Sequence, residues 1–298
     1  MRSKPFIILL SLISLAFGVL LVTAQEPDDE VRGAFISTRP KTTNSNPPTR
    51  RRRIRNANSS SATSKNTNST AANASRTANK NGSVTHKLAE AMGLGYTLFM
   101  RAPNGRTVRA EPSREFHNGD SVRIALEPNV DGYLYVFHTE GNGEPEMIYP
   151  DWRLDGGENW IEAHVPVEVP SSEETDERLR WFTFYGNAGI ERLYVVVSRE
   201  PLPGVPTGDR LVTFCAANKD KCPWRPLSEV WAQLQNATRA EVKVVAAKSF
   251  GQPLSDKEQV ATTRGLGLDQ TAPEPSVIRM NASTNAPVLV AVLDLIHK

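Results

Sequence analysis

The sequence predicts a mainly β protein: an antiparallel β-sandwich-like domain with one short helix, preceded by a signal peptide and a disordered linker. Every Trp and Tyr of the 298-residue chain lies at or after Tyr96, so the apolar core belongs to the C-terminal part. From Leu94, short apolar runs are broken by Pro, Gly, Asn and Asp at spacings of about ten residues, which is typical of antiparallel sheets. We therefore expect three regions, at residues 1–24, 25–90 and 91–298.

The first region has the pattern of a secretory leader. Arg2 and Lys4 precede an apolar stretch that ends in Val22-Thr23-Ala24, and small residues at the last and third-last positions suit signal peptidase. An uncleaved anchor in the inner membrane is the alternative, because residues 6–24 approach the roughly 20 residues that span a bilayer. Both interpretations predict an exported protein, which is periplasmic or secreted if the leader is cleaved.

The second region, residues 25–90, is predicted to be a disordered linker because it is rich in Ser, Thr and Asn and poor in large apolar side chains. It carries 12 Lys and Arg against 5 Asp and Glu through residue 93. Five of its arginines form one block, which is either a solvated spacer or a contact for an anionic membrane or cell wall: Arg50, Arg51, Arg52, Arg53 and Arg55. Nucleic acid is not expected as a partner, because the leader predicts export.

In the third region, alternation predicts a sheet with one wet face. Val122, Ile124 and Leu126 share one side of a strand, and Arg123 and Glu127 share the other. Residues 132–138 are apolar on both faces and predict a central strand. Further strands are predicted at 94–100, 106–110, 160–165, 180–185, 193–198, 210–214, 241–247 and 288–296.

One helix is predicted after Pro226, where Leu227, Val230, Trp231 and Leu234 recur at intervals of three and four residues. That spacing places the four side chains on one apolar stripe, which can pack on a sheet.

The two cysteines, Cys215 and Cys222, have six residues between them in a polar run that reads as a loop. Two cysteines without a matching histidine pattern cannot complete a tetrahedral zinc site. In an oxidising compartment they are expected to close a short disulfide loop, and two free thiols are the alternative.

Several stretches resemble a known family. The segments at residues 116–124, 131–137, 147–150 and 193–201 are similar to the bacterial domain of unknown function 4384. The resemblance covers a core at about residues 110–202 and leaves residues 203–298 as a C-terminal extension. It implies a β-sandwich-like module of exported bacterial proteins, and it brings no assigned activity or catalytic residue.

Candidate chemistry is sparse in the sequence. The five histidines lack metal-ligand spacing, and His138 and His164 are expected at the rim where strands end. No nucleophile elbow or phosphate-binding loop is found, so no catalytic residue, metal or cofactor is predicted. Trp152 and Tyr149 are the aromatics most suited to face a ligand, and core packing is the alternative for both.

These observations favour an exported, non-enzymatic binding or interaction module of the bacterial cell envelope. Its partner would be an unknown protein or an envelope polymer. The alternatives are an envelope hydrolase whose active site is assembled from scattered residues, and a structural accessory subunit of a larger complex.

Overall fold

The structure is a computed structural model, and it describes residues 27–41 and 91–298. The predicted signal peptide, the arginine block and the rest of the linker up to residue 90 lie outside the described residues. None of the helices in the described ranges is both long enough and apolar enough to span a bilayer.

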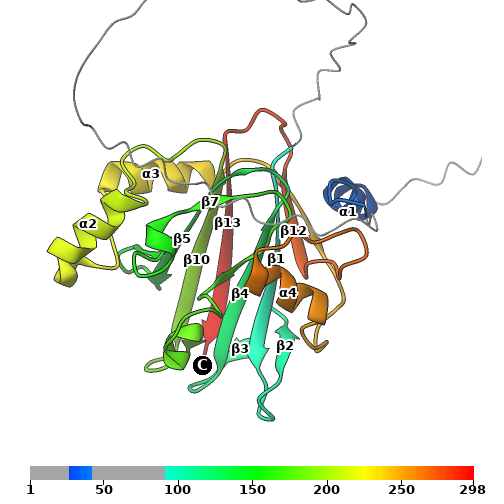
Figure 1. The fold of residues 1–298 in the computed structure, drawn as a ribbon, viewed down its shortest axis with the longest axis horizontal. Coiled ribbons are helices and arrows are strands. Elements are labelled where there is room, and N and C mark those ends of the chain that lie inside the picture. The colour runs from blue at the N-terminus through cyan, green and yellow to red at the C-terminus, as the bar shows by residue number, and fades with distance from the viewer. Residues whose placement is uncertain (1–26, 42–90) are drawn as a thin grey trace, which may run out of the picture.

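Residues 91–298 form a sandwich of two sheets, with seven and six strands in the described part of the chain (Figure 1). The strands of the seven-stranded sheet are β1 (Gly93–Arg101), β2 (Thr107–Ala110), β4 (Ser121–Pro128), β8 (Val167–Val169), β9 (Phe182–Thr183), β11 (Val242–Ala246) and β12 (Val277–Asn281). Those of the six-stranded sheet are β3 (Glu115–Phe116), β5 (Gly132–Glu140), β6 (Glu146–Tyr149), β7 (Trp160–Ile161), β10 (Gly189–Ser198) and β13 (Val288–His297).

Strand pairing follows the order β11-β12-β1-β4-β8 in one sheet and β3-β13-β10-β5-β6 in the other. The pairs are antiparallel except for β13 with β3. The predicted central position of β5 is confirmed, and β13 is also internal, between β3 and β10. Both faces of β5 are covered over most of its length, which explains why it is apolar on both.

The main core lies between the sheets. It contains the alternate residues that the sequence pattern predicted to share one face. Among them are Val122, Ile124 and Leu126 of β4, which are all 1% exposed or less. Val195 and Val197 of β10 meet them from the opposite sheet. Period-two alternation therefore located the inner faces correctly.

Helices cover the outer face of each sheet, so the sandwich has four layers (Figure 1). The α-helices in the described ranges are α1 (Pro27–Ser37), α2 (Asp209–Ala217), α3 (Ser228–Ala237) and α4 (Asp256–Arg264). Short 3-10 turns occur at Asp155–Gly157, Glu177–Arg180 and Lys219–Lys221. The helices α2 and α3 lie beside the six-stranded sheet, and α1 and α4 lie beside the seven-stranded sheet.

The mainly β fold class is confirmed, but the prediction of a single helix is wrong. The helix predicted after Pro226 is α3, although Leu227 is 65% exposed and lies outside its apolar stripe. The strand predicted at 210–214 is helix α2 instead. Its buried residues, Leu211 and Cys215, are four positions apart, and the cover that they form on the outer face of β5 and β10 decides the conformation.

Two predicted strands are shorter than expected. Only Trp160–Ile161 of the run at 160–165 pairs with β5, and only Phe182–Thr183 of the run at 180–185 pairs with β4. Both runs leave the sheet within a few residues, so their apolar side chains pack from loops.

The predicted cysteine pair lies at disulfide distance. The sulfur atoms of Cys215, in α2, and Cys222 are 1.98 Å apart. Replacing both cysteines with alanine is expected to lower the free energy of unfolding by about 2–3 kcal/mol, because a short closed loop is released in the unfolded chain. Urea unfolding of both proteins, with and without reductant, measures this loss. Reductant should destabilise the wild type and leave the double variant unchanged.

A surface ion pair joins the two longest strands of the six-stranded sheet. Arg192 of β10 donates to Asp294 of β13 at 2.6 Å and holds the pKa of that carboxyl below its ordinary value. The stabilisation is therefore present above about pH 4 and is lost as the pH falls through the lowered pKa. Because both side chains are partly exposed, we expect Asp294→Asn to lower stability at pH 6 by at most about 1 kcal/mol. The difference between the urea midpoints of the two proteins should be smaller at pH 3 than at pH 6. A difference that is larger at pH 3 would contradict this assignment.

Candidate functional site

The strongest candidate site holds the segment at residues 27–41 on the outer face of the seven-stranded sheet. This segment was expected to be part of the disordered linker that starts at residue 25, and that expectation is wrong for it. Its helix α1 lies on β11 and β12, where its apolar side chains join a small cluster with the sheet: Val31, Phe35 and Ile36 of α1 with Val245, Ile278 and Met280.

The local sequence explains why the segment begins as a helix. Pro27 suits the first helical position, and Asp28, Asp29 and Glu30 place three carboxylates in the first turn, where the helix dipole favours them. These signals are present in the sequence, but they occupy a single helical turn of a region whose overall composition is typical of a disordered linker.

Phe35 fills a slot that the sheet leaves open for an aromatic ring. Its side chain is fully buried, and its ring meets the ring of His164 edge-on at 5.4 Å. The slot exists because Gly93 and Gly95 carry no side chain there. A Cβ atom on either glycine would stand 3.0 Å from the Phe35 ring, and one on Gly95 would also stand 2.4 Å from Pro275. The two glycines therefore give the surface its fit to the ring.

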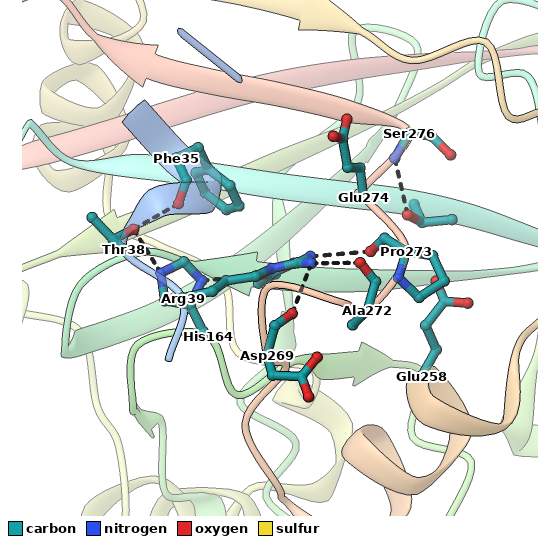
Figure 2. Close-up of polar contacts among 12 residues, drawn as sticks. Phe35, Thr38, Arg39, His164, Glu258, Asp269, Ala272, Pro273, Glu274 and Ser276 are labelled. Carbon is teal, nitrogen blue, oxygen red and sulfur yellow. Dashed lines mark hydrogen bonds and ion pairs between the residues drawn. The ribbon is translucent and has the colours of Figure 1, made fainter. Parts of the chain in front are cut away.

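Arg39 enters a buried pocket in which all five of its N–H donors find an acceptor (Figure 2). Nε and Nη2 donate to the two carboxylate oxygens of Glu127, each at 2.7 Å. The remaining donors reach the main-chain carbonyl oxygens of Asp269 at 3.4 Å, Ala272 at 3.0 Å and Pro273 at 3.1 Å. This planar fork suits a guanidinium, whereas a lysine has only three donors at a single point.

His164 connects the segment to the domain, and its expected position at the rim is wrong. Its side chain is 2% exposed, with Nδ1 2.8 Å from Glu127 Oε1 and Nε2 2.8 Å from the hydroxyl of Thr38. Its main chain donates to Pro128 and accepts from Leu268. The φ angle of 59° is one that L-residues rarely adopt, so these contacts hold a strained conformation in place.

The series Thr38–His164–Glu127 has the connectivity of a hydrolase triad. The Thr38 hydroxyl, however, lies 2.6 Å from the carbonyl oxygen of Phe35, which can only accept. The hydroxyl has one proton, and its shorter contact directs that proton to Phe35 rather than to Nε2 of His164. A general base needs the proton directed at its own nitrogen instead. The arrangement closes the end of α1 and fastens it to β4.

A second buried ion pair holds α4 over the same face. Arg109 of β2 pairs with Glu258 of α4, and both side chains are at most 10% exposed. The same arginine donates to the hydroxyl oxygens of Thr97 at 3.1 Å and Ser276 at 3.4 Å. Glu258 also closes a capping box with Ser255 at the start of α4. One carboxylate thus fixes both the start of the helix and its contact with the sheet.

A third buried pair lies further along β4. Arg123 donates to Glu168 of β8 at 3.4 Å and stacks its guanidinium over the ring of Trp181, 4.2 Å from the ring centre. Burial lowers the pKa of Arg123, and the charge of Glu168 opposes that shift. The prediction that Arg123 and Glu127 face water is therefore wrong: they are 7% and 4% exposed.

Between the sheet and α4 remains a small, partly open cavity of about 20 Å³, lined in part by Thr97, Glu127, Glu258 and Thr262. That volume accommodates roughly one water molecule. Within residues 27–41 and 91–298, no three His, Cys, Asp or Glu side chains gather closely enough to hold a metal ion.

The two aromatic side chains predicted to face a ligand are only partly exposed. Trp152 is half-buried against the cluster that packs α2 and α3 on the six-stranded sheet, and Tyr149 is half-buried against the main core. Trp160 is the more exposed tryptophan, at 37%. The assignment of Trp152 and Tyr149 to a ligand stays a prediction, and the arginine block at 50–55 lies outside the described residues.

Together, the fold and this site define a helix-covered β-sandwich module that holds a segment of its own chain in a fitted, buried site. Residues 115–201 match the family model described as "Domain of unknown function (DUF4384)", and this match supports the family that the sequence resemblance indicated. No curated protein and no solved structure matches the chain. Glu127 and His164 lie inside the matched residues, whereas Arg39 and the carbonyls that bind it lie outside.

Proposed function

We propose that this chain is an exported, non-enzymatic binding or interaction module of the bacterial cell envelope. The observation that carries the proposal is the way in which the domain binds residues 27–41. A slot between glycines takes the ring of Phe35, and a pocket with five acceptors takes the guanidinium of Arg39. Shape fit together with complete pairing of a buried charge is the chemistry of specific peptide recognition.

The close-set ionisable groups of the domain also favour binding over hydrolysis. Arg39 with Glu127, Arg109 with Glu258 and Arg123 with Glu168 each bridge two elements of the fold. The cavity beside Glu127 and Glu258 has room for about one water molecule. Their charges therefore hold segments in place.

The basic linker would supply a second contact. Residues 94–298 carry 21 Lys and Arg against 28 Asp and Glu, so the domain itself is mildly acidic. The block of arginines at residues 50–55 is the strongest local positive charge in the sequence. It would attract anionic lipid or wall polymer by about 1 kcal/mol per residue near such a surface.

The test is export followed by crosslinking in the native envelope. We expect the tagged full-length chain in the periplasm or the medium, with its N-terminus at Gln25, crosslinked to a specific envelope component. A variant with all five block arginines changed to serine should lose that crosslink at low salt. A matched control changes four scattered basic residues of the linker to serine: Lys65, Arg76, Lys80 and Lys87. Retention of the chain in the cytosol, or no crosslink from any of the three chains, would reject the proposal.

A further inference from the structure

We propose that the surface under residues 27–41 is a binding site for a guanidinium-bearing peptide segment, and that a second copy of this chain supplies this segment in trans. The inference rests on the proposed function, because it assigns a partner to the same recognition surface. The ligand has the pattern Phe35-x-x-Thr38-Arg39, in which the end of α1 and the turn after it bring the aromatic ring and the guanidinium to the same face of the sheet.

The segment can be regarded as a ligand and its site as a receptor, because a long stretch of sequence separates the two. Forty-nine residues separate Lys41 from Ala91. Every contact described above for Phe35, Thr38 and Arg39 with the domain is made by residues beyond 91. Among the described residues, no contact in the site requires the segment and the domain to belong to one molecule.

The main chain of the segment is also recognised. The side chain of Gln270 donates to the carbonyl oxygens of Ser37 at 3.3 Å and Arg39 at 3.2 Å, and its own N–H donates to Pro40 at 3.1 Å. Three hydrogen bonds to main-chain carbonyls within four residues fix the path of the chain as it leaves the helix. The site therefore binds the main chain of the segment as well as the side chains of Phe35 and Arg39.

Charged residues at the edge of the site complement the segment. Arg32 meets Glu274 at 3.0 Å, and Glu30 meets Lys243 of β11 at 3.9 Å. These pairs are partly exposed, so they guide orientation more than they add affinity. A second copy carries the same charges in the same order, and reciprocal exchange of the two segments closes a two-fold symmetric dimer.

The first test uses the full-length Arg39→Ala chain, in which the acceptors of the pocket remain but the resident guanidinium is gone. A fluorescent peptide of residues 27–41 should bind this chain, as measured by anisotropy. It should bind the wild-type chain about tenfold more weakly or less, because the resident segment competes from within the molecule. A peptide carrying Arg39→Ala should bind neither chain.

The matched control for the pocket is the full-length Arg39→Ala chain that also carries Glu127→Gln. It removes the carboxylate that the peptide guanidinium needs, so the affinity for the wild-type peptide should fall at least about tenfold. A peptide with Arg32→Ala, which alters only the edge of the site, should keep its affinity within about threefold.

The second test looks for exchange between whole chains. Two wild-type chains with different masses should exchange their segments reciprocally and form a mixed dimer, detected by native mass spectrometry, that disappears on adding excess peptide. If the Arg39→Ala chain fails to fold by circular dichroism, prolonged incubation of the wild-type chain with excess labelled peptide replaces it, and saturable uptake is expected.

No peptide uptake by any folded chain, together with monomers in every mixture, would overturn trans docking. That result is distinguishable from failure of the proposed function. An envelope component crosslinked equally to wild-type and Glu127→Gln chains would leave the binding module standing and place its partner elsewhere on the surface.

Discussion

Glu127→Ala is expected to lower the free energy of unfolding by about 3–5 kcal/mol. The wild-type carboxylate accepts two hydrogen bonds from Arg39 and lies 2.8 Å from Nδ1 of His164, and both of those side chains are at most 2% exposed. Removing it leaves a guanidinium in a buried pocket with only main-chain carbonyls as hydrogen-bond acceptors. Urea unfolding followed by tryptophan fluorescence measures the loss.

Two further variants separate the charge from the packing. Glu127→Gln keeps the volume and one acceptor oxygen, so its loss should be smaller than that of Glu127→Ala. Combining Glu127→Leu with Arg39→Met removes both charges and should recover part of the stability, because two apolar side chains avoid the desolvation cost of the pair. A loss below about 1 kcal/mol for Glu127→Ala would mean that water reaches the pocket, and the pair would then resemble a surface ion pair.

The long strands could be predicted from the sequence because their periodicity is local. In β4, Val122, Ile124 and Leu126 alternate with polar neighbours, and the pattern alone assigns the inner face. The short strands β7 and β9 could not be delimited, since a run of apolar residues does not reveal where a partner strand ends.

Besides α2, which was predicted as a strand, two helices were missed for different physical reasons. In α4 only Glu258 and Ala261 are buried, so the helix lacks an apolar stripe, and its one local signal was the capping box that starts at Ser255. In α1 the signals were present but short, and its stability comes from packing on the sheet rather than from its own sequence.

The site was beyond sequence reasoning because its partners are distant. Arg39 and Glu127 are 88 positions apart, and Arg109 and Glu258 are 149 apart. Alternation on β4 suggested that Glu127 faces water, which would hold for a sheet with one bare face. A charged residue on the outer face of a strand gives the same sequence pattern whether solvent or another segment of the chain covers it.

Phe35→Ala is expected to release α1 from the sheet and to lower the free energy of unfolding by about 3–5 kcal/mol, up to the full docking energy of the segment. The ring is fully buried, and the glycines that face it offer no side chain that could fill the void. Limited trypsin digestion reads this release directly, because the bond between Arg32 and Gly33 becomes accessible once the segment detaches.

Ile36→Ala is the matched control, since Ile36 is the neighbouring apolar residue of α1 and is only half-buried. Its loss should be about 1–2 kcal/mol, with trypsin cleavage at Arg32 remaining slow. A second variant, Gly95→Val, tests the slot from the domain side: its Cβ would press on Pro275 and on the ring, so cleavage at Arg32 should accelerate although the segment is unchanged. Equal cleavage rates in Phe35→Ala and Ile36→Ala would show that general apolar burial, and not the fit of the ring between glycines, holds the segment on the sheet.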